Sequence, residues 1–72
     1  MNRKTVKQRV EKEQSKLFKK ITKLEAFIWY SNVYREELSA HQQDLLQMQL
    51  NAMYNYVSIL EMRLKALGET AE

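Results

Sequence analysis

The first half of the chain carries apolar side chains at the spacing of a helix with one apolar stripe. Successive members are three and four residues apart in alternation, once the polar Gln14 is counted in the series. This spacing predicts an α-helix over about residues 5–29 and not a strand, whose apolar positions would alternate. The stripe consists of Val10, Leu17, Ile21, Leu24 and Ile28.

The second half predicts another long helix. Ser39 with Gln42 three residues later forms a capping box, so this helix should begin near residue 40. It should end near residue 67, with Gly68 as a left-handed cap. Residues 30–39 are expected to form the turn, because Ser31 and Asn32 compete there for backbone hydrogen bonds. The sequence therefore predicts an all-α fold, with residues 1–72 forming one antiparallel two-helix hairpin domain.

Aromatic side chains are crowded at the expected turn. Trp29, Tyr30 and Tyr34 lie within six residues of one another. Such a cluster either closes the end of a helical bundle or offers a surface on which planar ligands stack. We favour the first interpretation, because aromatic side chains bury large areas.

The expected second helix is apolar over three neighbouring rows, which is more than one partner helix can cover. A chain this short also buries too little apolar surface to be very stable alone. Both arguments predict assembly into an oligomeric helical bundle, a homodimer or a homotetramer. The rows are Leu46, Met53, Leu60 and Leu67; Leu45, Ala52 and Ile59; and Leu50, Val57 and Leu64.

A polar row runs among these apolar rows. Gln49, Tyr56 and Arg63 are seven residues apart, so on a helix they lie one above another. Their position between the rows of Leu46 and Leu50 predicts an interior or interfacial location. A buried guanidinium must be paired, which leaves two interpretations.

In the first interpretation the polar row is a structural network that fixes helix register. Tyr56 would meet Gln49, and Arg63 would meet a carboxylate, either Glu13 or else Glu25 or Glu61 of another subunit. In the second, the row lines a polar cleft between subunits, where Arg63 contacts a phosphate and Tyr56 and Gln49 contact a planar base. Lys20, on the flank of the first helix, would add a second cation.

Composition excludes several classes of site. The chain has no cysteine and one histidine, so thiolate and imidazole metal sites are not expected, and no cofactor is predicted. There is no glycine-rich phosphate loop and no nucleophile beside a base. An enzyme that stabilises an anionic transition state with Arg, Lys and Gln alone is conceivable, but we predict a protein that is not an enzyme.

Charge is distributed unevenly along the chain. Residues 1–24 hold nine Lys or Arg against two Glu, for a net charge of +7, and residues 25–72 have a net charge of −4. The basic residues alternate with core positions and form no recognition motif, which argues against sequence-specific nucleic-acid binding. No apolar run is long enough for a membrane span, and no secretory signal is recognisable. We therefore expect a protein that stays in the cytoplasm and binds no membrane.

Several short motifs resemble a known group of proteins. They are Leu24-Glu25-x-Phe27-Ile28, Gln49-x-x-x-Met53-x-x-Tyr56 and Leu60-x-x-Arg63. Over about residues 10–67 the chain resembles the short helical-hairpin proteins of bacteriophages and prophages, the crAss-phage-related small proteins. It is also similar to the anti-CBASS nucleotide sponges, which assemble as oligomers and sequester cyclic-dinucleotide immune signals. The chain departs from the pattern of these proteins at the turn, which is short and polar in them but carries the large side chains of Trp29, Tyr30 and Tyr34 here.

The resemblance implies a function in the cytoplasm of an infected bacterial host. The protein would bind a cyclic dinucleotide such as cyclic GMP-AMP at its subunit interfaces without cleaving it, and so block CBASS defence. Lys20 and Arg63 would contact phosphates, and Gln49 and Tyr56 the bases. The alternative is an oligomeric interaction module or inhibitor that binds another protein and no small ligand.

Overall fold

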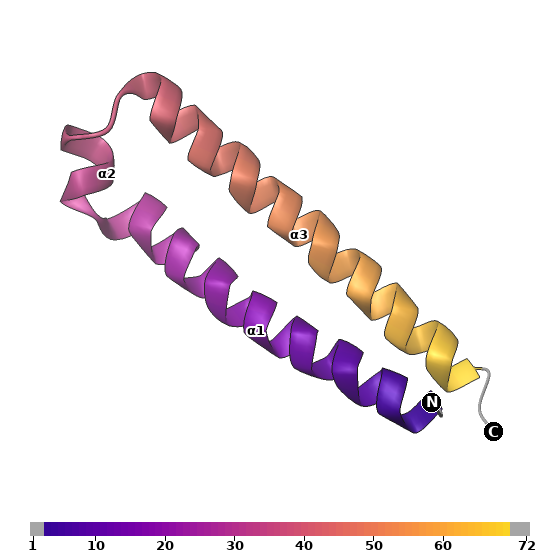
Figure 1. Ribbon diagram of the computed structural model, residues 1–72. Coiled ribbons are helices and arrows are strands. Elements are labelled where there is room, and N and C mark those ends of the chain that lie inside the picture. The colour runs from indigo at the N-terminus through magenta and orange to yellow at the C-terminus, as the bar shows by residue number, and fades with distance from the viewer. Residues whose placement is uncertain (1–2, 70–72) are drawn as a thin grey trace.

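The computed structural model describes the backbone of residues 3–69 and the side chains of residues 6–68. Three helices follow one another: α1 (Arg3–Tyr30), α2 (Asn32–Glu36) and α3 (Ala40–Glu69). Helices α1 and α3 lie side by side and run in opposite directions, with α2 across one end (Figure 1). The all-α prediction is confirmed. The short helix α2 lies inside the segment expected to be only a turn.

Serine side chains define the starts of the two later helices. Ser31 has extended backbone angles, and its Oγ accepts a hydrogen bond from the Val33 amide at 3.1 Å, so α2 begins directly after it. Ser39 Oγ accepts from the Gln42 amide, also at 3.1 Å. Each hydroxyl satisfies an amide that has no partner within its helix. The helix start predicted from Ser39 is confirmed.

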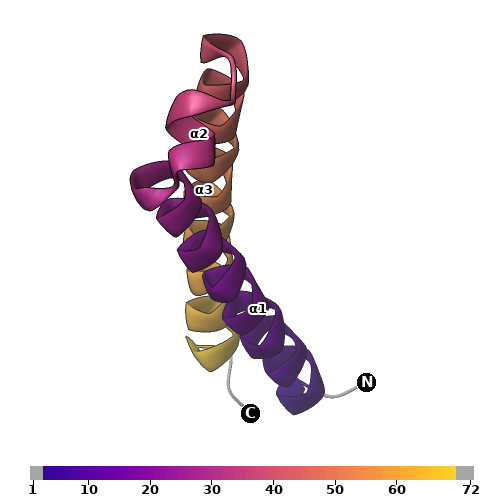
Figure 2. The same cartoon turned by 90° about the vertical axis from the view of Figure 1, so that its left-hand side faces the viewer.

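The core is a single layer of apolar side chains between α1 and α3. The stripe of α1 faces inward, since four of its five apolar members are buried. On α3, Leu50, Val57 and Leu60 are buried, and Leu60 is fully inaccessible. The row of Leu45, Ala52 and Ile59 does not face α1: Ile59 is 50 % exposed. Figure 2 shows that the two long helices cross at an angle and diverge toward the chain termini.

Tyr34 closes the α2 end of the helix pair. It is buried, its ring meets that of Phe27 edge to face at 6.0 Å, and its hydroxyl donates to the Gln43 carbonyl at 3.2 Å. The side-chain amide of Gln47 donates to the same hydroxyl at 2.9 Å. The side-chain amide of Gln43 donates to the backbone carbonyls of Tyr34 and Leu38. These bonds fix α2 against the first turns of α3.

The interpretation of the turn aromatics as a plug is right for Tyr34 and wrong for the other two. Trp29 is 56 % exposed and Tyr30 is 78 % exposed. Both lie at the end of α1, on sides of the helix that point away from the core stripe of Ile21 and Ile28, so most of each ring stays exposed. The expected glycine cap is also wrong. Gly68 lies within α3 and has no left-handed backbone angle, so the helix continues to Glu69.

Removing the Tyr34 hydroxyl should destabilise the fold. Tyr34→Phe keeps the ring contact with Phe27 but leaves the part-buried Gln47 amide without its acceptor. We expect the free energy of unfolding to fall by about 1–2 kcal/mol, measured by urea denaturation followed by circular dichroism. Tyr30→Phe is the matched control and should change nothing, because Tyr30 is exposed. Equal stability of both variants would contradict the role assigned to the Tyr34 hydroxyl.

Among the described residues, no helix combines the length and the apolar character needed to cross a membrane.

Candidate functional site

The polar row of α3 lies on one flank of the helix pair. Gln49, Tyr56 and Arg63 are all exposed in the single chain, Tyr56 by 42 %. An interior location within one chain is therefore wrong. The reason is angular: the row is one residue out of register with the core positions Leu50 and Val57, which places it beside the contact with α1 and not inside it. Burial of the row between subunits stays a prediction.

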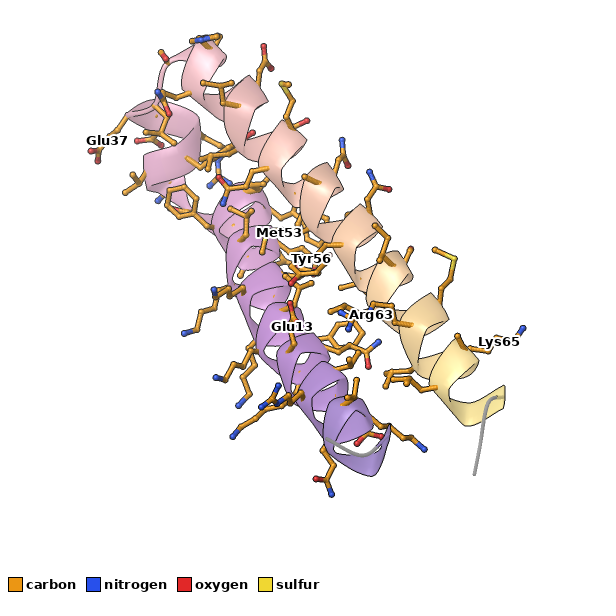
Figure 3. All side chains as sticks on the ribbon, turned by 45° about the vertical axis from the view of Figure 1, so that its right-hand side comes forward. Glu13, Glu37, Met53, Tyr56, Arg63 and Lys65 are labelled. Carbon is orange, nitrogen blue, oxygen red and sulfur yellow. The ribbon has the colours of Figure 1, made fainter. Side chains whose placement is uncertain are left out.

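Arg63 and Tyr56 converge with a residue of α1. Figure 3 shows Glu13 on α1 and Tyr56 and Arg63 on α3 on the same side of the helix pair, with their side chains directed toward the space between the helices. Glu13 is half-buried. One aromatic and one cationic side chain thus share a flank of the helix pair with one carboxylate. We call the surface formed by Glu13, Lys20, Gln49, Tyr56 and Arg63 the polar face.

The Arg63 guanidinium has no charged partner among the side chains that the structure describes. Among residues 6–68 it forms no ion pair or hydrogen bond. Glu25 accepts a hydrogen bond from Tyr54 instead. Glu61 is two residues from Arg63, about 200° around the helix, so it points elsewhere. Within one chain, Glu13 is the candidate carboxylate that shares the flank of Arg63 (Figure 3). Pairing of Arg63 with Glu25 or Glu61 of another subunit stays a prediction.

Arg63 also borders a recess at the open end of the helix pair. Val6 of α1 and Ala66 and Leu67 of α3 form the rest of its lining, and its volume is about 280 Å³. The guanidinium therefore lies at the edge of an apolar hollow. Such a hollow lowers the local dielectric constant, which strengthens the attraction between a cation and an anionic ligand.

Lys20 belongs to the same flank of α1 as Glu13. The two residues are seven positions apart, two helical turns or about 10 Å along the axis. Ile28 of α1 and Leu50 of α3 line the same groove, so these two residues lie at the same level of the antiparallel pair. Because Lys20 comes eight residues before Ile28, it is level with the part of α3 around Tyr56. Lys20 is exposed. Helical spacing thus places all four predicted site residues on one flank of the helix pair, where Gln49 and Arg63 lie about 21 Å apart along α3.

A second groove at the α2 end was not predicted from the sequence. Its volume is about 420 Å³, and its lining includes Trp29 and Arg35. The Arg35 guanidinium is held in place by hydrogen bonds to the Trp29 carbonyl and the Asn32 side chain. The signal for this groove was the cluster of turn aromatics, which we interpreted as a plug. The other residues that line it are Ile28, Tyr34, Gln47, Leu50 and Asn51.

A hydrogen bond on the opposite flank from the polar face couples stability to pH. The Tyr54 hydroxyl donates to the Glu25 carboxylate, and this bond, followed by burial and the Glu25 charge, raises the pKa of Tyr54 above its ordinary value of 10.0. The folded state therefore holds the phenolic proton more tightly. The stability that the bond contributes is fully present below pH 10 and is lost as the pH rises through the raised pKa.

Titration of tyrosinate absorbance should detect this bond. We expect one tyrosine of the native protein to ionise above pH 10, and this late component should be absent from Tyr54→Phe. In Glu25→Gln the component should move toward the ordinary value, because the carboxylate is gone while the phenol remains. An unchanged titration curve in Glu25→Gln would contradict the assignment.

The chemistry available on the polar face is that of binding. Arg63 offers a planar donor fork for a phosphate, Lys20 a second positive charge, Tyr56 a ring for stacking and Gln49 an amide that both donates and accepts. Within the described part of the chain no group of His, Asp or Glu side chains could hold a metal ion.

Comparison with known proteins identifies the family. A family model described as Sequestin matches residues 4–66, a range that covers most of both long helices and all four predicted site residues. The chain belongs to the Sequestin family. No curated protein and no solved structure matches the chain.

The Sequestin match agrees with the sponge part of the resemblance drawn from the sequence. The family name indicates a protein that sequesters a partner. A bacteriophage origin and a relation to the crAss-phage proteins stay predictions. The match extends beyond the motifs on which the resemblance was based, toward the basic N-terminal turns of α1.

Proposed function

We propose that this Sequestin-family protein binds a small nucleotide signal that carries two phosphates and holds it without cleaving it. A cyclic dinucleotide such as cyclic GMP-AMP is the leading candidate. By lowering the free concentration of the signal in the cytoplasm of an infected bacterium, the protein would keep a CBASS effector of the host inactive. The bound state is a homo-oligomer, with the ligand at a subunit interface.

The observation that carries the proposal is the position of Arg63. Its guanidinium is exposed, has no ionic partner among the described residues, and shares a face with Tyr56. A guanidinium binds phosphate through two parallel charge-assisted hydrogen bonds, and a neighbouring aromatic ring can stack on a base. A ligand that combines a phosphate with a planar base satisfies both groups at once.

The charge of the flank supports a ligand with two negative charges. Lys20 and Arg63 are separated along the polar face, so two phosphates are needed to engage both. Glu13 opposes binding of an anion, which leaves a net charge of +1 on the face of one chain.

Titration calorimetry with a panel of nucleotides tests the proposal. The panel contains cyclic dinucleotides, cyclic trinucleotides and cyclic nucleotides whose two phosphates are joined as a pyrophosphate. Linear dinucleotides of the same bases serve as controls for shape, and mononucleotides as controls for charge. We expect tight binding of at least one cyclic compound and much weaker binding of its linear counterpart. The absence of heat with every compound would refute the sequestration of a nucleotide.

The second candidate is an interaction module that inhibits another protein. It is favoured by the exposed apolar row on α3, in which Leu45 is 40 % and Ile59 is 50 % exposed. A patch of this kind marks protein contacts more often than small-ligand sites. Heat on titration with any nucleotide of the panel would exclude this candidate, which binds no small ligand.

Nucleic-acid binding through the basic turns of α1 makes a different prediction. It requires affinity for DNA or RNA that falls steeply with salt concentration. Weak binding that is independent of salt would exclude it.

A further inference from the structure

A regular stripe of exposed side chains follows the side of α3 that faces away from α1. Its members are three and four residues apart in alternation, the spacing of a two-stranded coiled coil. We call this stripe the outer seam. It consists of Leu45, Met48, Ala52, Asn55, Ile59 and Met62.

Four of the six seam residues are large, apolar and exposed in the single chain. Met48 and Met62 are 64 % and 61 % exposed, and Ile59 is 50 % exposed. The seam spans about 26 Å of a straight helix. Helix α1 cannot reach it, because α1 already packs on the opposite side of α3 against Leu50, Val57 and Leu60. A continuous apolar seam of this length indicates a helical partner.

We propose that the partner is a second copy of this chain, whose α3 packs antiparallel on the outer seam. The two-fold axis passes between Ala52 and Asn55, because the seam is symmetric in size about that point. Met48 then faces the partner's Ile59, and Leu45 faces the partner's Met62. The small Ala52 faces the partner's Asn55 and leaves room for its amide.

Charges beside the seam favour the antiparallel arrangement. On one edge, Asp44 of each copy lies opposite Lys65 of the other. The two-fold axis therefore relates two Asp44–Lys65 ion pairs. In a parallel pair, Asp44 would lie beside the partner's Gln49, and Ser58 beside the partner's Arg63. Neither pair combines opposite charges. A parallel pair would also put Ala52 opposite Ala52 and leave a gap in the seam.

The other edge of the seam carries the polar row, and here the inference deepens the proposed function and rests on it. In the antiparallel pair Gln49 lies beside the partner's Tyr56, and Arg63 beside the partner's Gln42. Each nucleotide site would therefore combine Arg63 and Tyr56 of one copy with two glutamine amides of the other. One ligand per chain is the expected stoichiometry.

Light scattering of seam variants tests the pairing. Ile59→Glu places a charge in the seam and should raise the dissociation constant of the dimer at least about tenfold, so that monomers are found at concentrations where the native chain is paired. Circular dichroism should stay helical, because Ile59 is exposed in the single chain. Phe18→Glu, the same change at an exposed apolar residue of α1, is the matched control and should leave the dimer intact.

Charge reversal tests the register. Asp44→Lys and Lys65→Asp should each weaken the dimer, and the double variant should recover it, since the ion pairs re-form with exchanged signs. A native chain that is monomeric, a dimer that tolerates Ile59→Glu, or a double variant no stronger than the single ones would overturn the pairing.

The two proposals fail in different ways. A monomer that still binds a nucleotide would overturn the seam and leave sequestration standing. A dimer that obeys the seam variants but gives no heat with any nucleotide would support the seam and refute sequestration.

Discussion

Arg63→Ala should weaken nucleotide binding by roughly 10- to 100-fold, the loss expected for one or two charge-assisted hydrogen bonds to a phosphate. The fold should survive, because the side chain is exposed and makes no hydrogen bond or ion pair among the described residues. Calorimetry gives the change in affinity, and thermal unfolding followed by circular dichroism gives the stability. We expect the stability to change by less than about 0.5 kcal/mol.

Two variants separate the geometry of Arg63 from its charge. Arg63→Lys keeps the positive charge but loses the planar fork, so it should bind with intermediate affinity. Lys19→Ala removes the same charge from an exposed position on the outward side of α1 and should bind like the native protein. If Lys19→Ala weakened binding as much as Arg63→Ala, net charge and not a site would explain the affinity.

The structural interpretation of the polar row makes the opposite prediction for the same residue. If Arg63 serves to pair with Glu13, then Arg63→Ala and Glu13→Gln should each lower the stability, and the double variant should be no worse than either. If Arg63 serves a phosphate, Glu13→Gln should instead tighten binding, because it removes the negative charge from the polar face. Measuring stability and affinity of both single variants decides between the two.

Leu60→Ala is expected to have the largest effect on stability. Leu60 is 0 % exposed, the lowest value among the described core residues, and it lies between α1 and α3. Truncating such a leucine costs about 2–5 kcal/mol through lost contacts and the cavity left behind. A chain of this size has little stability in reserve. We therefore expect a large drop in the midpoint of thermal unfolding, with partial loss of helix at room temperature.

A matched truncation at the surface controls for the general effect of losing a large side chain. Phe18→Ala removes a larger group that is 46 % exposed, and it should cost much less than Leu60→Ala. Equal losses in the two variants, or an unchanged midpoint in Leu60→Ala, would mean that the contact between α1 and α3 is not what holds the chain together.

The core of α1 could be predicted from the sequence because only one stripe of that helix is apolar. Val10, Leu17, Ile21 and Ile28 are buried as their spacing indicates. The same reasoning was ambiguous for α3. Three neighbouring apolar rows give no preference for the one that faces α1, and the structure selects the sides of Leu50 and Leu60 and leaves Ile59 exposed. That choice depends on packing between helices, which periodicity in one helix does not contain.

The end of the helix pair was the least predictable part of the fold. The hydrogen bond from the Val33 amide to Ser31 starts a helix of only five residues, too short to produce a periodic pattern. The burial of Tyr34 depends on Gln43 and Gln47, which lie nine and thirteen residues away. Composition marked the aromatic residues as notable but could not show which of them α3 would cover.

The sequence predicted the alignment of the candidate site residues along α3 but not their exposure to solvent. Heptad spacing places Gln49, Tyr56 and Arg63 above one another on any helix, so their alignment followed from the sequence. Their exposure did not, because a difference of one residue from the core positions separates a buried row from a flanking one. The approach of Glu13 depends on the register between α1 and α3, which the contacts of Tyr34 help to set.

The central claim is that the protein holds a nucleotide and releases it unchanged, and recovery of the ligand tests it most directly. The protein is mixed with a slight deficit of the nucleotide that binds best and passed through a membrane that retains only protein. The retained protein is then denatured by heat, and the released nucleotide is analysed by chromatography. We predict little nucleotide in the first filtrate and full recovery of the intact compound after denaturation. Free nucleotide in the first filtrate, or cleaved products after denaturation, would contradict the account.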